Sequence, residues 1–442
     1  MSEAGMAMDE PARLEVDRLL DDRETRIIVC CGSGGVGKTT TAAALGLRAA
    51  ERGRRAVVLT IDPARRLAQS MGIDSLDNTP RKVTGVGGRG DGSEGVDGGH
   101  GDGDGGDPGE LHAMMLDMKR TFDEIVEGHT DPERAEAILA NPFYQSLSAG
   151  FAGTQEYMAM EKLGQLRARD DWDLIVVDTP PSRSALDFLD APKRLGSFLD
   201  GKFIRVLMAP AKVGGRAGMK FLNVGMSLMT GTLSKLMGAS LLKDVQTFVA
   251  AMDTMFGGFR TRADATFRLL QAPGTAFLVV AAPEPDALRE AAYFVERLAA
   301  ERMPLAGLVL NRVHGSDADQ LSAERALAAA ENLEEGGIVD QESGKAGLRD
   351  DDRSTPDTGL DVGADTTAEA DADVDEITAG LLRLHAERMQ VIAREQRTRD
   401  RFTSLHPEVA VAEVAALPGD VHDLAGLRAI GERLAAGVPA GA

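Results

Sequence analysis

The chain has 442 residues and a formal net charge of −21, from 49 Lys and Arg against 70 Asp and Glu. This acidic balance argues against a nucleic-acid-binding protein, which usually carries a basic excess. Aromatic residues make up only 4% of the chain, so stacking surfaces for single-stranded nucleic acid are not expected either.

Short apolar runs alternate along the chain with segments of helical spacing. The predicted buried strands are Arg26–Cys31, Ala56–Thr60, Asp173–Asp178, Thr275–Ala281 and Leu305–Leu310, with Leu111–Leu116 as a candidate edge strand. Helical patterns occupy Thr40–Arg52 and Asp286–Arg302. This alternation predicts an α/β fold, a mostly parallel sheet flanked by helices, over residues 24–436. Residues 1–22 are predicted to be a flexible N-terminus.

Two acidic segments interrupt the alternation. Residues 85–110 contain 13 glycines and a net charge of −6, and residues 334–376 have a net charge of −12. Together they carry −18 of the net charge, so the rest of the chain is nearly neutral. Such segments cannot bury enough apolar surface to offset their chain entropy. We therefore expect both to be disordered surface inserts.

The middle of the chain differs from the strand segments. Residues 195–270 are rich in Met, Leu, Phe and Gly, and apolar residues recur at helical spacing from Leu241 through Phe259. This pattern predicts an α-helical subdomain inserted into the α/β domain. Methionine side chains are flexible and polarisable, which suits a groove for varied apolar partners. They would equally well fill the core of the subdomain itself, and composition does not separate the two interpretations.

The two cysteines and the chain termini bear on the compartment. Cys30 and Cys31 are neighbours in a predicted strand, where they point to opposite faces and are expected to be packing residues. No disulfide framework, apolar signal segment or run of 18 apolar residues is present. We expect a cytoplasmic protein without a zinc site.

A phosphate-binding motif follows the first predicted strand. Gly32–Thr39 fits GxxxxGK[ST], with a strand before it and a helix after it. Its glycines let successive backbone N–H groups face phosphate oxygens, and the helix N-terminus adds partial positive charge. A strand–helix turn that only needs glycine is the alternative. The predicted nucleotide-binding residues are Gly34, Gly35, Val36, Gly37, Lys38, Thr39 and Thr40, with Lys38 as the mobile cation and Thr39 as a Mg²⁺ ligand.

Two carboxylates follow neighbouring predicted strands. Asp178 ends the run DLIVVD, where ligands of parallel sheets bind, and it is expected to hold Mg²⁺ through water. Asp62 follows the second strand and could orient or deprotonate an attacking water. Both aspartates could instead be helix N-caps, since a proline follows each closely.

These segments together resemble the ArsA family of P-loop ATPases, which includes arsenite-pump ATPases and ATPases that target tail-anchored membrane proteins. The resemblance rests on GSGGVGKTTTAAALGLRAAERGRRAVVLTIDPARRLAQ, DLIVVDTPPSRSALDFL, LAGLVLNRV and LPGDVHDLAGL. It implies Mg²⁺-dependent ATP hydrolysis by a nucleotide-switched dimer, with Asp62 positioning the attacking water. It also implies that Asn311 contacts adenine, with backbone of Pro418–Val421 closing over the base, and that a hydrophobic client or membrane protein binds the helical region.

The chain departs from the family pattern in three ways. Ser33 stands where the family has a second lysine that reaches the partner's phosphates across the dimer. A homodimer is therefore expected to hydrolyse ATP slowly, unless a lysine-bearing paralogue completes a heterodimer in which this chain is a regulatory subunit. The CxxC zinc clamp of the targeting branch and the arsenite-binding cysteines of the pump branch are both absent from the sequence.

Two other classes use the same loop. A ParA/MinD-like positioning ATPase would need a basic DNA-binding face or a membrane-binding terminal helix, and the nearly neutral body disfavours both. A metabolic kinase would need an acceptor pocket with a base, which no segment of the sequence indicates. Any contact with the membrane is expected to be peripheral and through a partner.

Overall fold

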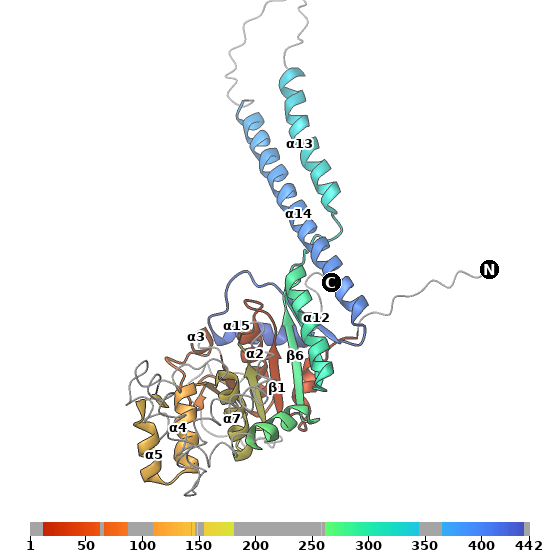
Figure 1. Ribbon diagram of the computed structural model, residues 1–442. Helices are drawn as coiled ribbons and strands as arrows, with labels where there is room; N and C mark the ends of the chain where they lie inside the picture. Colours follow the sequence, from red (N-terminus) through yellow and green to blue (C-terminus); the bar gives the residue numbers. More distant parts are fainter. Residues whose placement is uncertain are drawn as a thin grey trace, which may run out of the picture.

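In the described part of the chain, the strands form a single eight-stranded sheet (Figure 1). The computed structural model describes residues 12–61, 66–86, 109–142, 144–145, 148, 154–180, 258, 261–343 and 365–436. In spatial order the strands are β3 (Arg81–Lys82), β4 (Glu110–Met115), β2 (Arg55–Thr60), β5 (Leu174–Asp178), β1 (Ile27–Cys31), β6 (Thr275–Ala281), β7 (Leu305–Val313) and β8 (Val411–Ala415).

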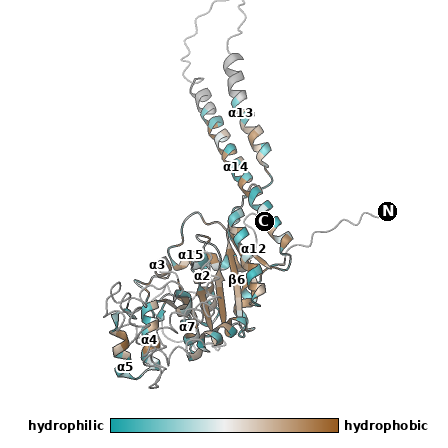
Figure 2. Ribbon diagram, in the orientation of Figure 1, coloured by the Kyte–Doolittle hydropathy of each residue, from teal (hydrophilic) through white to brown (hydrophobic). Residues whose placement is uncertain are grey.

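Every pairing in this sheet is parallel except that of β3 with β4. The predicted α/β fold with a mostly parallel sheet is confirmed. All residues of β1, β5 and β6 are buried, as continuous apolar runs in the centre of a parallel sheet should be (Figure 2). The strand predicted at the edge, β4, is second from it, because the two-residue antiparallel β3 lies outside it.

Helices lie between the strands and at both ends of the described chain. They are α1 (Val16–Asp21), α2 (Lys38–Glu51), α3 (Arg66–Ser70), α4 (Met118–His129), α5 (Pro132–Leu139), α7 (Thr154–Arg169), α12 (Pro285–Ala300), α13 (Ala323–Ser343), α14 (Asp365–Leu405) and α15 (Leu424–Ala436). Helix α1, with Val16 and Leu20 buried, differs from the flexible N-terminus expected over residues 1–22. No helix within the described ranges is long and apolar enough to cross a membrane.

Strand order places these helices on two faces of the sheet. From β1 the chain crosses through α2 to β2 in one direction along the sheet, whereas from β6 it crosses through α12 to β7 in the other. Because such crossovers are right-handed, α2 and α12 cover opposite faces. Helix α15 packs beside α2, and α12 also contacts α14. The central strands are thereby covered on both sides.

The helices α13 and α14 form a hairpin that projects from the sheet domain (Figure 1). Ala326 and Ala330 of α13 and Ala379 and Ala386 of α14 are buried in it. This differs from the expectation of a disordered insert over residues 334–376, because α13 extends to Ser343 and α14 begins at Asp365. The four alanines flank the expected insert, and they favour helix and permit close packing of the two helices that extend into it.

Two other predicted segments lie mostly outside the described residues. The acidic insert 85–110 is described only at its two ends. The helical subdomain 195–270 is described only at residue 258 and from residue 261, and residues 261–271 are helical.

Candidate functional site

The loop between β1 and α2 owes its path to glycines with backbone conformations that other residues rarely adopt. Gly32 has φ +151°, and a Cβ there would lie 2.0 Å from the carbonyl oxygen of Val280. Gly37 directly precedes α2 with φ +96°, and its Cβ would lie 2.2 Å from Nδ2 of Asn311. A side chain at either position would force the loop away from the sheet. The motif therefore encodes a tightly seated loop and not merely a turn.

Asp178 is fully buried at the carboxyl end of β5, and two hydroxyl groups converge on its carboxylate. Oγ1 of Thr39 donates a hydrogen bond to Oδ2 of Asp178 at 2.7 Å, and Oγ1 of Thr60 donates to the same oxygen at 2.9 Å. Strand order explains the meeting, because β5 lies between β1, which leads into the glycine loop, and β2, which ends at Thr60. In the sheet register Thr60 is the partner of Asp178.

Lys38 folds back over the loop that precedes it. Its side chain is buried, and its Nζ donates a hydrogen bond of 2.7 Å to the carbonyl oxygen of Ser33. Gly34 and Gly35 are exposed at the top of the loop, whereas Val36 is buried beneath it. This bond holds the ammonium group of Lys38 at the loop, and its contact with phosphate oxygens remains a prediction.

Asn311, predicted to contact adenine, reaches the loop from β7. Its side chain is buried, and Nδ2 donates a hydrogen bond of 2.8 Å to the carbonyl oxygen of Val36. It thus holds the glycine loop from two strands away along the sheet, beyond β6. One N–H of the amide serves this bond, and contact of the side chain with a base remains a prediction.

Asp62 lies outside the described residues, but the chain just before it is anchored. The backbone N–H of Ile61 donates to the carbonyl oxygen of Asp178 at 3.0 Å. The carbonyl oxygen of Ile61 accepts a hydrogen bond of 3.0 Å from Nε2 of Gln155, near the start of α7. These bonds tie the segment that leads into Asp62 to the end of β5 and to α7.

Thr60 and Gln155 were not among the predicted site residues. Thr60 could have been found from its place, since a polar residue that ends an apolar strand beside a carboxylate-bearing strand is a candidate partner. Gln155 offered no such signal, because its helix follows residues with no motif and its role depends on tertiary packing.

The two cysteines are packing residues, as expected. Both thiols are buried and free, and Sγ of Cys31 lies 3.6 Å from the carbonyl oxygen of Leu278. Burial, and then the negative charge of Asp178, raises the pKa of Cys30 well above its ordinary value. Burial raises the pKa of Cys31 to about 12. Neither thiol is suited to metal binding or nucleophilic chemistry, which require the thiolate.

The donor set at Asp178 suits Mg²⁺. A carboxylate and a threonine hydroxyl are hard oxygen ligands, and Mg²⁺ typically takes one or two such ligands together with phosphate oxygens and water. Within the described ranges no group of three or more His, Cys, Asp or Glu side chains could hold a metal ion by itself. The protein groups therefore fit a metal that arrives with a phosphate ligand better than a resident one.

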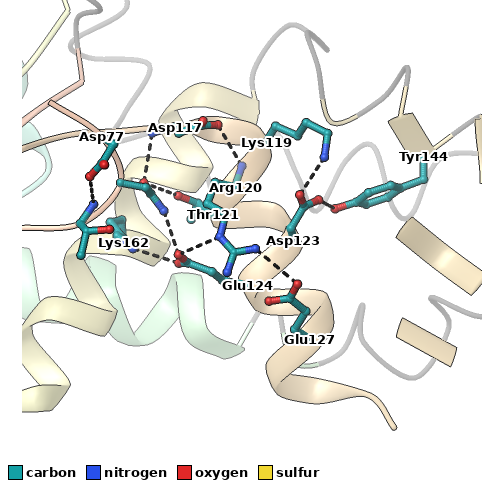
Figure 3. A network of polar contacts seen from close by, with 12 residues as sticks. Asp77, Asp117, Lys119, Arg120, Thr121, Asp123, Glu124, Glu127, Tyr144 and Lys162 are labelled. Atoms are coloured by element: carbon teal, nitrogen blue, oxygen red, sulfur yellow. Dashed lines mark hydrogen bonds and ion pairs between the residues drawn. The ribbon is translucent and has the colours of Figure 1, made fainter. Parts of the chain in front are cut away.

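Polar contacts link α4 to α7 and to neighbouring segments (Figure 3). Nζ of Lys162 lies 2.9 Å from Oε2 of Glu124 on α4, and Asn78 donates to Oε1 of the same carboxylate. The hydroxyl of Tyr144 donates to Asp123, also on α4, at 2.5 Å. Because Lys162 is buried, this pair fixes the position of α7 more firmly than an exposed ion pair would.

Comparison with known proteins adds an independent finding. The family model for anion-transporting ATPases, ArsA_ATPase, matches residues 25–88 and 108–335. An ATPase GET3 of Podospora anserina is 25% identical over 328 residues, which cover 73% of this chain and 84% of that protein. A putative arsenical pump-driving ATPase of Halobacterium salinarum is 29% identical over 199 residues, 45% of this chain and 28% of that protein. ATPase ARSA2 of Chlamydomonas reinhardtii is 24% identical over 310 residues, which cover 70% of this chain and 73% of that protein.

Proposed function

The chain belongs to the ArsA ATPase family, and on that premise we propose that it binds ATP with Mg²⁺ at the Gly32–Thr39 loop and hydrolyses it. The observation that carries the proposal is the meeting of Thr39, Thr60 and Asp178 at the mouth of this loop, with bonds of 2.7 and 2.9 Å. A phosphate loop, a hydroxyl and a carboxylate together form the constellation that phosphoryl transfer needs. The ATPases among the similar proteins support the same activity.

Each site residue has a distinct role in this proposal. The backbone N–H groups of the loop and Lys38 bind the phosphates, and Thr39 and Asp178 would hold Mg²⁺, which neutralises phosphate charge when bound. Asp62 would position or deprotonate the attacking water. Gln155 and the end of β5, which hold the backbone of Ile61, would fix where Asp62 can lie.

Ser33 sets the expected rate of hydrolysis. A cation supplied across a dimer contributes about 10³–10⁵ in rate in related phosphoryl transfers, and a serine hydroxyl cannot replace it. We propose a slow ATPase when the chain acts alone, and a regulatory subunit when a lysine-bearing paralogue is its partner.

The experiment compares ATP turnover of the wild-type chain, of Ser33→Lys, and of the wild type mixed with a lysine-bearing paralogue. The proposal expects turnover that rises at least about tenfold in the second or third sample. Thr130→Lys, which adds the same charge at the residue that follows α4, is the control and should leave turnover unchanged. Brisk turnover by the wild type alone would overturn the role given to Ser33.

We further propose that the nucleotide state is communicated to the helical region, where a hydrophobic client or partner would bind. Helix α7 supports this route, because Gln155 near its start holds Ile61 and Glu161 in its middle pairs with Arg262 at 2.8 Å. Arg262 lies in the helical residues 261–271 at the end of the predicted insertion. Glu161 is buried, so a shift of α7 would carry Arg262 with it.

The test is binding of an apolar helical peptide in the presence of ATP and of ADP. A difference between the two states that is reduced in Glu161→Gln supports the proposal, because the variant keeps the size of the side chain and loses its charge. Asp171→Asn is the control, since Asp171 follows α7 and is exposed. Peptide binding that is absent in both states, or unaffected by Glu161→Gln, would contradict this route.

A further inference from the structure

Helix α14 carries an apolar stripe that no described residue covers. Seven large apolar side chains are exposed in the described part of the chain, and four of them are Val374, Ile377, Leu381 and Leu384. Their exposed fractions are 58, 64, 61 and 63%. Single exposed apolar residues are ordinary, but a contiguous row on one helix usually marks an interaction surface.

The spacing of the stripe identifies the shape of its partner. The intervals of three, four and three residues match the a and d positions of a heptad, the pattern by which helices pack against other helices. The opposite side of α14 already packs on α13, where Ala379 and Ala386 are buried. One apolar side of α14 is thus covered by α13, and the other side is shaped to pack against a further helix.

Gly380 lies beside the stripe at its midpoint. It is exposed, and a Cβ at this position would meet no atom within 4 Å. Glycine in an exposed helix interior is unfavourable relative to alanine, and the described part of a single copy gives no steric reason for it. Close approach of a second backbone is such a reason.

The charges along α14 favour one orientation. Asp373, Asp375 and Glu376 lie at one end of the stripe, and Arg383, Glu387 and Arg388 lie at the other, where Arg383 is already paired with Glu334 of α13. Two copies side by side in parallel would place the three acids of one beside those of the other, whereas an antiparallel pair places them beside the end that carries Arg388. A two-fold axis at residue 379 pairs Ile377 of one copy with Leu381 of the other and Val374 with Leu384, and each Gly380 then lies one residue from the axis.

We propose that the α13–α14 hairpin is a self-association element, and that its occupant is the hairpin of a second copy of this chain, packed antiparallel through the stripe. An isologous contact of this kind closes as a dimer. The hairpin follows the carboxyl end of β7, and the glycine loop follows the carboxyl end of β1, so both lie at the same end of the parallel strands. The inference does not depend on nucleotide binding.

The first test is sedimentation of the full chain without nucleotide over a range of concentrations. The wild type should dimerise, and Leu381→Glu should weaken the dimer more than about tenfold, because burial of one leucine side chain exceeds a factor of ten in an equilibrium constant. Tyr293→Glu is the matched control, since Tyr293 of α12 is 56% exposed and lies off the hairpin. All three proteins should bind ATP alike, which separates this interface from the nucleotide site.

The second test measures register. Ile377→Cys and Leu381→Cys are prepared separately, mixed and treated with a short thiol cross-linker, and the native thiols do not interfere because both are buried. The mixture should cross-link more than either variant alone. The proposal would be overturned if the wild type stays monomeric at its highest soluble concentration, or if Leu381→Glu dimerises as strongly as the wild type. Binding of an added apolar peptide to the stripe of a monomeric wild type would overturn it too.

Discussion

Asp178 is buried, and it accepts hydrogen bonds from the glycine loop and from the end of β2. Its carboxylate receives Thr39 from the glycine loop and Thr60 from β2, and its backbone carbonyl receives Ile61. A buried carboxylate without such donors would be strongly unfavourable. The same bonds that stabilise it also hold the ends of three chain segments together.

Asp178→Asn should weaken binding of Mg–ATP at least about tenfold, because the amide is a poorer Mg²⁺ ligand and places N–H groups toward two hydroxyls. Asp173→Asn, at the other end of β5, is the matched control and should leave binding unchanged. Titration calorimetry measures both. Equal affinity of Asp178→Asn and the wild type would remove the metal role from this residue.

His112 gives a prediction for pH. Burial lowers the pKa of this imidazole, which packs edge-on against Trp172 with ring centroids 4.7 Å apart. The unfolded chain therefore takes up the proton first, near a pKa of about 6.5, and the folded chain only at lower pH. Stability should fall as pH decreases through this window, by at most about 1.4 kcal/mol per pH unit from this one group.

The measurement is the free energy of unfolding between pH 7.5 and pH 5, by denaturant titration. His112→Phe should have a shallower dependence on pH than the wild type. His422→Phe, at an exposed histidine, should keep the wild-type slope. Identical slopes for His112→Phe and the wild type would show that other groups cause the dependence.

How far single residues could be predicted depends on whether the signal is local. The glycine loop and Asp178 were recognisable because their order along the chain encodes their chemistry. The buried position of Arg54 could not be predicted, since in the sequence it is a charged residue just before a strand. It is 1% exposed, and its guanidinium donates to carbonyl oxygens of Leu20, Thr25 and Asp173. Burial lowers its pKa, and only the tertiary fold supplies the acceptors.

Among the elements, α2 packs on the sheet through a glycine. A Cβ on Gly46 would lie 2.5 Å from Cγ2 of Val58 and 3.2 Å from Cδ1 of Leu111. The helix can therefore approach β2 and β4 only where this side chain is absent. Since α2 begins at Lys38, the closeness of this contact also fixes the loop that precedes it.

Gly46→Ala should lower the free energy of unfolding by about 1–3 kcal/mol, since the added methyl pushes α2 away from the sheet. Gly431→Ala on α15 is the matched control. Its Cβ would lie 3.6 Å from the nearest atoms, an ordinary contact, so the variant should gain up to about 1 kcal/mol of helix propensity. Denaturant unfolding of both variants checks this, and a destabilised Gly431→Ala with a neutral Gly46→Ala would contradict the packing argument.

At the scale of elements, continuous apolar runs were the dependable signal. The predicted strands that became β1, β2, β5 and β6 agree with the structure to within one residue at each end, because each is buried on both faces. The two-residue β3 offers no pattern, and β8 was not predicted although four of its five residues are apolar. The hairpin was missed because its acidic composition outweighed the alanine spacing.

For the whole molecule, net charge is concentrated in two segments outside the sheet. The first of them joins β3 to β4, which pair antiparallel with Lys82 opposite His112. The ends of this connection are therefore close together at the sheet edge. A short linker could span them without stretching either strand.

Replacing residues 89–107 by a short Gly-Ser linker should change the free energy of unfolding by less than about 1 kcal/mol, because loop-closure entropy varies slowly with length. ATP binding should be unchanged, since the site lies at other strand ends. A variant of equal length with Ser in place of the acidic residues separates charge from length. Loss of cooperative unfolding would show that this segment contributes to the fold.

The central claim is that the Gly32–Thr39 loop binds an adenine nucleotide with Mg²⁺. Titration calorimetry of ATP into the wild type and into Lys38→Ala, with and without Mg²⁺, tests it most directly. The account predicts binding at one site per chain that is strengthened by Mg²⁺ and weakened at least about tenfold by Lys38→Ala. Absence of binding with Mg²⁺ present, or equal affinity of the two proteins, would contradict it.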